Sequence, residues 1–363
     1  MTSESSTTPL TLIHDLETWL QTQEPRVATW VEQVDFRASV GEVCSVPGAD
    51  GRIVAVLAGI QDRNDPYQYA ALPQRLPPGT YHFADSLTQT QANAAALGWA
   101  LGSYVYRRYG KSQIFAVLSW PEQAQVEHVQ AIIDAIFLGR ELITTPANDM
   151  GPAQLAQAAQ TLAGKYGAEA SLIVGDDLLT QNFPAVHAVG RAAGADAAPR
   201  LIDFSWGDAS HPKVTLVGKG VCFDTGGLDI KGASGMLMMK KDMGGAATVL
   251  ALAQMVMADR LPVRLRVIIP AVENSVAGNA MRPLDVLQTR KGLTVEVGNT
   301  DAEGRLILSD ALALADAESP DLLIDFATLT GAARVALGTE LPALYATDDD
   351  VAAAILTAGK EVY

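Results

Sequence analysis

The second half of the chain alternates short apolar segments with longer, alanine-rich ones. Runs of β-branched and other apolar residues are typical of buried strands, and the longer segments between them have helical spacing. The predicted strands cover residues 171–174, 201–206, 213–217, 264–272 and 322–327, and the predicted helices cover residues 152–166 and 244–259. Strands that alternate with helices form a sheet that helices cover on both faces. We therefore expect an α/β domain with a mostly parallel or mixed sheet.

The first third of the chain has the pattern of a smaller α/β domain. Helical segments are expected at 16–34 and 91–108, and strands at 52–60 and 113–120. The chain has 363 residues, 48% of them hydrophobic, which is enough for two cores. We expect an N-terminal α/β domain at 1–121, a linking helix at 122–145 and a larger catalytic domain at 146–363.

The composition and net charge of the chain argue against some classes of binding partner and some cellular locations. A net charge of -15 disfavours binding to nucleic acid or to an anionic membrane. No apolar run is long enough to span a bilayer, and the Ser/Thr-rich start of the chain does not resemble a signal peptide. Cys44 and Cys222 are the two cysteines, and Cys222 lies in a strand-like segment. We expect two free thiols in a reducing cytoplasm.

An acidic stretch, NTDAEGRL at residues 299–306, stands between a predicted strand at 293–297 and a predicted helix at 307–317. Asp301, Glu303 and Arg305 occupy every second position. If the backbone is extended, the two carboxylates point to one side and repel each other unless a cation lies between them. A divalent metal ion is one interpretation. The other is that the acids cap the following helix.

A second charged region follows the predicted strand at 213–217. Lys219 stands between two glycines, and Asp224 precedes another pair, where glycine lets the backbone approach a ligand closely. Asp242 precedes the alanine-rich helix, so it is a candidate metal ligand or a helix N-cap. The neighbouring Lys240 and Lys241 are expected to lie in a solvated turn.

Other chemistries have weaker support in the sequence. The segment that begins at Gly218 does not match GxGxxG, because Phe223 takes the place of the last glycine, and no GxxxxGK[ST] string occurs. None of the five histidines lies in a charged region, and nothing places one near Cys222. Oxygen ligands suit Mn²⁺, Mg²⁺ or Zn²⁺, and four carboxylates suggest a site for two ions.

These motifs resemble the leucyl aminopeptidase family of cytosolic metallo-exopeptidases. NTDAEGRL at 299–306, VGKG, FDTGG, DIK and KDMGGAA upstream, and DFATLTG downstream occur in the family's order, from about Ala147 onward. The resemblance implies that two metal ions are bound by Lys219, Asp224, Asp242, Asp301 and Glu303, with Asp224 and Glu303 bridging them. It implies a catalytic pair, Lys231 and Arg305, and a substrate site formed by Met239, Asn299, Thr328, Leu329 and Gly331.

The resemblance also implies the reaction. Water activated by two Mn²⁺ or Zn²⁺ ions would attack the peptide bond and release N-terminal leucine and other apolar residues. Lys231 would donate to the oxyanion, and Arg305 would hold a bicarbonate ion. The family assembles as a hexamer in the cytoplasm. Thr225 and Gly232 depart from the usual Ser and Pro, and the family continues beyond residue 363, so the chain is expected to be C-terminally truncated relative to it. A DNA-binding scaffold and a phosphoryl-transfer enzyme are the alternatives, and the charge and the missing phosphate loop disfavour them.

Overall fold

The computed structural model describes residues 7–111 and 113–362, which form two compact units. One unit extends to Asp134 and the other runs from Ala135 to Glu361. The division falls within the helix α5 (Val126–Thr144), which occupies the segment predicted to link two domains. The exact domain boundaries at residues 121 and 146 stay predictions.

The first unit contains a sheet with the strand order β2-β3-β1-β4-β5. β1, β3, β4 and β5 run parallel, and β2 pairs antiparallel with β3. The strands are β1 (Thr8–Ile13), β2 (Val43–Pro47), β3 (Ile53–Gly59), β4 (Thr80–Phe83) and β5 (Val117–Leu118). The helices are α1 (Leu16–Leu20), α2 (Pro25–Gln33), η1 (Pro66–Tyr69), α3 (Leu72–Arg75) and α4 (Gln89–Gly102).

Three of the helices and strands predicted for this unit extend further in sequence than the elements in the structure. The segment 16–34 forms two helices because Pro25 has no N–H and stands at the first turn of α2. α4 ends at Gly102, six residues before the predicted end at 108. The expected strand at 113–120 is reduced to the two residues of β5.

The second unit contains the larger sheet, with the order β13-β8-β10-β7-β6 and with β9 also paired to β10. β8, β9, β10 and β13 run parallel, and β7 is antiparallel to both of its neighbours. The strands are β6 (Ser171–Val174), β7 (Arg200–Trp206), β8 (Lys213–Gly218), β9 (Gly220–Asp224), β10 (Arg264–Asn274) and β13 (Leu322–Phe326). A small antiparallel pair is formed by β11 (Val286–Gln288) and β12 (Thr294–Glu296).

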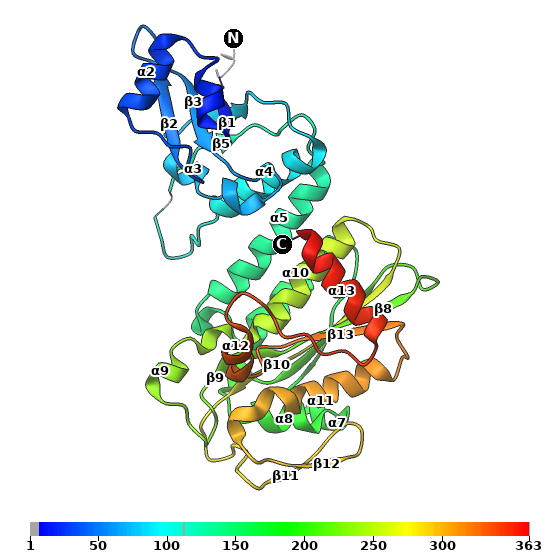
Figure 1. Cartoon of the computed structure of the whole chain (residues 1–363). Coiled ribbons are helices and arrows are strands. Elements are labelled where there is room, and N and C mark those ends of the chain that lie inside the picture. The colour runs from blue at the N-terminus through cyan, green and yellow to red at the C-terminus, as the bar shows by residue number, and fades with distance from the viewer. Residues whose placement is uncertain (1–6, 112, 363) are drawn as a thin grey trace, which may run out of the picture. The chain divides into compact units, whose positions relative to one another are not determined.

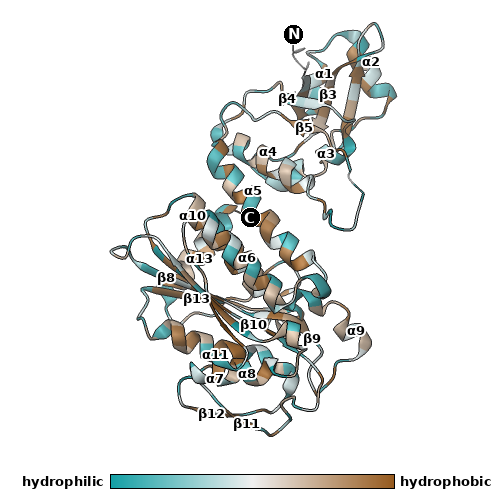
Figure 2. Ribbon diagram, turned by 180° about the vertical axis from the view of Figure 1, so that it is seen from behind, coloured by the Kyte–Doolittle hydropathy of each residue, from teal (hydrophilic) through white to brown (hydrophobic). Residues whose placement is uncertain are grey.

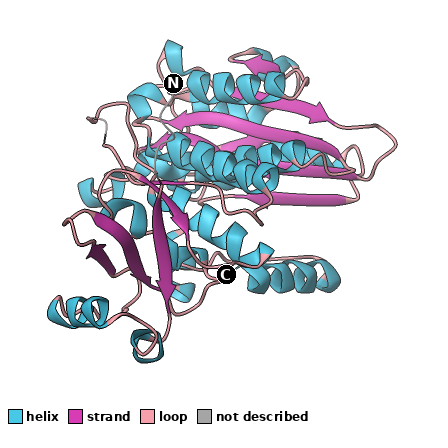
Figure 3. Cartoon of the chain, turned by 90° about the horizontal axis from the view of Figure 1, so that it is seen from above, coloured by secondary structure: helices cyan, strands magenta, loops and turns pink. Residues whose placement is uncertain are grey.

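Helices cover both faces of this sheet, as Figures 1 and 3 show. α6 (Pro152–Lys165) and α10 (Gly244–Ala258) pack on one face, and α8 (Pro184–Gly190) and α11 (Glu303–Asp316) pack on the other. The remaining helices are η2 (Ala147–Asp149), α7 (Asp177–Thr180), η3 (Ala195–Ala197), α9 (Ala233–Met236), η4 (Met239–Met243), η5 (Thr300–Ala302), α12 (Gly331–Leu337) and α13 (Asp349–Val362). Hydrophobic residues gather on the strands between the helical layers (Figure 2). The predicted fold class, a two-domain α/β protein with a mixed sheet, is confirmed.

A break in the sheet separates β8 from β9. Both strands lie on β10 in the same register, with Ile268 opposite Val217 and Ala271 opposite Gly220. Pro270 stands between these two pairs and has no N–H to offer, so the ladder is interrupted there. Lys219 follows β8, and its N–H donates to the Phe326 carbonyl at 2.9 Å, which continues the parallel pairing of β8 with β13. Its carbonyl accepts from the Ala246 N–H at 2.9 Å.

Two other sequence predictions concern exposure. Cys44 and Cys222 are both free thiols and both buried, and Cys222 lies in β9, as predicted. Within residues 7–111 and 113–362, no helix combines the length and the apolar character needed to cross a membrane.

Candidate metal centre

Lys219 is a buried lysine at the break between β8 and β9, with 3% of its side chain exposed. Its Nζ lies 2.7 Å from Asp242 Oδ2 and 3.0 Å from Glu303 Oε1, and it donates to the Thr328 carbonyl at 3.1 Å. Gly304 lies directly beside it, because a Cβ at this position would be 2.4 Å from Lys219 Cε. The bare glycine therefore gives the lysine room to pass the first turn of α11.

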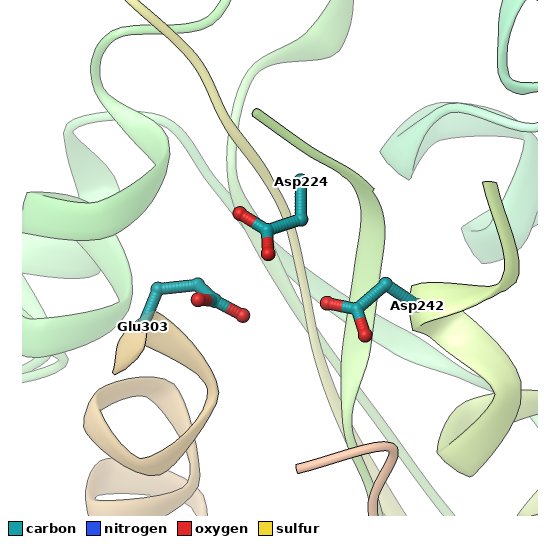
Figure 4. A group of neighbouring side chains, drawn as sticks. All are labelled: Asp224, Asp242 and Glu303. Carbon is teal, nitrogen blue, oxygen red and sulfur yellow. The ribbon is translucent and has the colours of Figure 1, made fainter. Parts of the chain in front are cut away.

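Three carboxylates from separate elements converge beside this lysine, as Figure 4 shows for Asp224, Asp242 and Glu303. Asp224 ends β9, Asp242 lies in η4 before α10, and Glu303 begins α11. One oxygen from each lies within 4.8 Å of the others, and all three residues are buried. A group of like charges this close is unfavourable unless cations compensate it.

A second lysine completes the group. Lys231 Nζ lies 2.9 Å from Asp224 Oδ2 and forms an ion pair with Asp301 Oδ1. We call Lys219, Asp224, Lys231, Asp242, Asp301 and Glu303 the carboxylate–lysine cluster. The structure thus brings together all five predicted metal ligands and one of the two predicted catalytic residues.

The pKa shifts of the cluster reflect burial and charge together. Burial raises the pKa of Glu303 to about 7, the Lys219 ammonium opposes this rise, and Asp224 and Asp242 add to it. Burial opposes the charge of Lys219, but the carboxylates of Glu303 and Asp242 outweigh it and raise the pKa of this lysine. Burial also opposes the charge of Lys231, whose pKa is raised by its contacts with Asp301 and Asp224.

The backbone at the acidic stretch is helical, so the condition of an extended segment, under which both carboxylates would point to one side, is not met. Asp301 lies in η5 and Glu303 is the first residue of α11, while the Asn299 side chain caps η5 by accepting from the Asp301 N–H at 2.8 Å. The two acids reach different lysines rather than pointing to one side. The N-cap interpretation of Asp242 is also wrong, because Met243 is the N-cap residue of α10.

Three polar residues that the sequence analysis did not select hold the cluster in place. Asn274 Nδ2 donates to Asp224 Oδ1 at 2.9 Å and to the Thr300 carbonyl at 3.0 Å. The Thr300 N–H donates to Asp229 Oδ2 at 2.7 Å, and the Asp229 N–H donates to Thr300 Oγ1 at 2.8 Å. These bonds join the loop after β9 to η5. The sequence signal for Asn274 is a polar residue at the end of the otherwise apolar run of β10.

Lys240 and Lys241 do not lie in a freely solvated turn, and that expectation is corrected. Lys240 Nζ donates to the carbonyl of Thr144, the last residue of α5. Lys241 Nζ lies 3.2 Å from Asp242 Oδ1. Both side chains are partly buried because the short η4 helix turns them back onto their neighbours.

The remaining predicted site residues differ in how far they are buried. Thr328 Oγ1 donates to Asp242 Oδ1 at 2.8 Å, so Thr328 belongs next to the cluster. Met239 is partly buried at the start of η4, Leu329 is 42% exposed, and Gly331 begins α12. Arg305 is exposed on α11, and within the described chain no hydrogen bond or ion pair joins it to the cluster.

The chemistry of the cluster fits divalent metal ions. Glu303 Oε1 and Asp301 Oδ1 are buried oxygens without a hydrogen bond of good geometry, although each faces a lysine ammonium. Carboxylate oxygens are the ligands that Mn²⁺, Mg²⁺ and Zn²⁺ accept, and a buried group of them is costly without cations. Asp224, Asp242, Asp301 and Glu303 are the residues that would hold such ions. Lys219 could join them only after losing its proton, which a nearby divalent cation favours.

Comparison with known proteins identifies the family of the chain. Models of two domains match the chain: "Cytosol aminopeptidase family, catalytic domain" over residues 137–363 and "M17 aminopeptidase, N-terminal domain" over residues 8–121. The site and the catalytic-domain match define the class: a hydrolase, of the metallo-exopeptidase kind. The chain belongs to the cytosol aminopeptidase family.

Individual relatives show how much of the chain is shared. A probable cytosol aminopeptidase of Leifsonia xyli subsp. xyli is 37% identical over 350 residues, which cover 92% of this chain and 70% of the relative. The crystal structure of a cytosol aminopeptidase from Coxiella burnetii is 47% identical, with a TM-score of 0.93, and the match covers 98% of this chain and 78% of that one. The bottromycin maturation enzyme BotP in complex with Mn is 32% identical, with a TM-score of 0.86, over 98% and 79% of the two chains. The chain spans 47–70% of the length of several curated relatives.

Proposed function

We propose that the protein is a metal-dependent aminopeptidase that releases N-terminal residues from peptides, with leucine and other apolar residues preferred. One observation carries the proposal: Asp224, Asp242 and Glu303 bring their oxygens within 4.8 Å of one another in a buried site that also holds two lysines. Bound divalent ions, two Mn²⁺ or Zn²⁺ in our proposal, would supply an activated water and a positive charge for the substrate. The manganese complex of the related BotP supports the choice of Mn²⁺ as the first ion to test.

Lys231 is the proposed electrophilic residue. Its side chain is 16% exposed, so it lies at the edge of the buried cluster, where substrate can reach it. Burial opposes its charge, but its contacts with Asp301 and Asp224 raise its pKa. An ammonium at this position can donate to the developing oxyanion. Replacing Lys231 with alanine is expected to lower kcat by about 10²–10³-fold, as for other oxyanion donors. Near-full turnover of K231A with the same amount of bound metal would contradict this role.

Arg305 is proposed to hold an anion. It is exposed on α11, two residues after Glu303, and within the described chain no hydrogen bond or ion pair occupies its guanidinium. A planar guanidinium binds carboxylate-like anions through two parallel hydrogen bonds, and bicarbonate has this shape. Arg305 would then keep a proton acceptor beside the reacting carbonyl.

Substrate selection is assigned to the residues around the cluster. An aminopeptidase must recognise a free α-amine, and the negative charge of Asp242 and its neighbours suits that group. Met239, Asn299, Thr328, Leu329 and Gly331 are proposed to contact the substrate. A homo-hexameric assembly, a cytoplasmic location and a metallopeptidase domain at residues 146–363 belong to the same proposal.

Hydrolysis of leucine p-nitroanilide by the full chain tests the function. We expect activity with Mn²⁺ that EDTA abolishes and that added Mn²⁺ restores. N-acetyl-leucine p-nitroanilide is the matched substrate control, and it should not be cleaved because its α-amine is blocked. Activity that persists after complete metal removal would contradict the proposal, as would equal cleavage of both substrates.

A further inference from the structure

A small cavity in the larger unit is lined by none of the residues of the carboxylate–lysine cluster. Its volume is about 260 Å³, and its walls are the turn after β6, the end of α8, the segment at 193–199 and the loop after β10. Asp176, His187, Arg191 and Asn279 provide its polar side chains, and the rest of its lining is glycine, alanine and Pro199. Pockets for drug-sized ligands have about 300–1,000 Å³, so this cavity suits a smaller molecule.

The walls of the cavity are joined to one another by hydrogen bonds. Arg191 Nε donates to the Asn279 carbonyl at 2.7 Å, and Asn279 Nδ2 donates back to the Arg191 carbonyl at 2.7 Å. The Gly175 N–H donates to the Pro199 carbonyl at 2.8 Å. Gly190 lies against Pro199, because a Cβ at this position would be 2.4 Å from the Pro199 Cβ. The cavity is therefore formed before a ligand enters, which lowers the cost of binding.

Two opposite charges at the wall of the cavity keep groups that can bind a ligand. His187 Nε2 lies 3.0 Å from Asp176 Oδ1, and the Asp176 side chain is 96% exposed. Within residues 7–111 and 113–362, no hydrogen bond or ion pair occupies Asp176 Oδ2 or the two terminal nitrogens of Arg191. A cationic group of a ligand can thus face Asp176 while an anionic group faces Arg191.

We propose that this cavity binds a free α-amino acid with a small side chain. The carboxylate of the ligand accepts two parallel hydrogen bonds from the terminal nitrogens of Arg191, and its ammonium faces Asp176. A simple anion such as phosphate is repelled by Asp176, and a simple amine is repelled by Arg191. Free amino acids are the compounds that the proposed reaction would release, but binding at this cavity does not depend on the metal centre.

The test is a titration of the full chain with L-alanine, followed by calorimetry and by ligand-detected NMR, with and without Mn²⁺. Ethylamine lacks the carboxylate and should bind about tenfold more weakly than L-alanine. Propionate lacks the ammonium and should bind about two- to fivefold more weakly, because Asp176 is largely exposed.

Variants at the two charges locate the binding in this cavity. R191M should weaken L-alanine binding by about tenfold, and D176N should bind L-alanine and propionate alike. R37M is the matched control, because it removes the same charge from an exposed side chain that does not line the cavity. It should bind L-alanine as the wild type does.

A third variant blocks the cavity and leaves both charges in place. Ala195 lines the cavity from an exposed position, so A195L should abolish L-alanine binding without unfolding the protein. This variant decides the question if circular dichroism and urea unfolding show that R191M is not native.

The outcomes separate this inference from the proposed function. Equal L-alanine binding by the wild type, R191M and A195L overturns the inference, as does binding of propionate or phosphate as tight as that of L-alanine. The absence of detectable L-alanine binding by the wild type also overturns it. If the chain binds L-alanine in this cavity but shows no metal-dependent hydrolysis, the proposed function is overturned and this inference stands.

Discussion

Replacement of Gly304 by alanine is expected to disturb the metal centre through a single added carbon. The new Cβ would lie 2.4 Å from Lys219 Cε and 2.9 Å from both Cδ and Nζ. Carbon atoms in contact prefer about 3.5–4.0 Å, so the end of the lysine must move by about 1 Å or more. Its Nζ would then lose hydrogen-bond distance to Asp242, which is now 2.7 Å away.

The replacement of Gly304 by alanine changes the free energy of unfolding through two opposing effects. Overpacking of a dense site costs about 1–3 kcal/mol. Alanine is favoured over glycine in a helix by about 0.5–1 kcal/mol. Gly164 in α6 supplies the matched control, since nothing lies within 4 Å of its added Cβ. G164A should therefore show the helix gain alone, and G304A should be less stable than G164A by the overpacking term, about 1–3 kcal/mol.

Urea unfolding of the metal-free proteins measures these stabilities, and a Mn²⁺ titration measures the centre. We expect G304A to bind Mn²⁺ more weakly than the wild type and G164A to bind it equally. A K219A background provides a further control, because the atoms that collide with the new Cβ are then absent. Equal stability changes for G304A and G164A, or an undiminished cost of G304A in the K219A background, would refute the reasoning.

Three further predictions concern the cluster and the buried thiols. N274L should lower the free energy of unfolding by about 1–3 kcal/mol and weaken Mn²⁺ binding, because Asp224 and a buried carbonyl lose a donor; an unchanged urea midpoint and metal affinity would contradict it. The native pKa of Glu303, about 7, lies above its ordinary value of 4.5, so folding binds a proton and the stability of the metal-free protein should fall as pH rises from about 4.5 to 7, by at most about 3 kcal/mol. E303Q should remove this part of the slope in pH-dependent urea unfolding, and an identical slope in E303Q would assign it elsewhere. Cys44 and Cys222 are buried, and burial raises the pKa of both thiols, so a disulfide reagent should react with neither in the native protein and with both after unfolding.

The strands of the larger sheet could be predicted from the sequence because they carry continuous apolar runs. The bounds predicted at 171–174 are those of β6, and the predicted strand at 213–217 differs from β8 by one residue. Segments with less hydrophobic support were predicted less well. The segment at 113–120 contains only two residues of strand, although its apolar composition resembles that of β3. Pairing with a neighbouring strand, rather than local propensity, decides such short edges.

The residue types of the cluster could be selected from sequence, but their geometry could not. The alternation of Asp301 and Glu303 would place both acids on one side of an extended backbone, whereas capping by Asn299 and the start of α11 make the segment helical. The lysine partners of Glu303 and Asp301 lie 84 and 70 residues earlier in the sequence, so no local pattern contains them. Asn274 was missed for the same reason, since it acquires its role only through tertiary contacts with Asp224 and the Thr300 carbonyl.

The break between β8 and β9 makes the position of Lys219 depend on three separate elements. Its backbone is bonded to Phe326 at the end of β13 and to Ala246 in α10, and its side chain passes Gly304 in α11. A change that shifts any one of these elements would therefore move the lysine relative to the carboxylates. The defect in the sheet is part of the site, and the rest of the fold compensates for it.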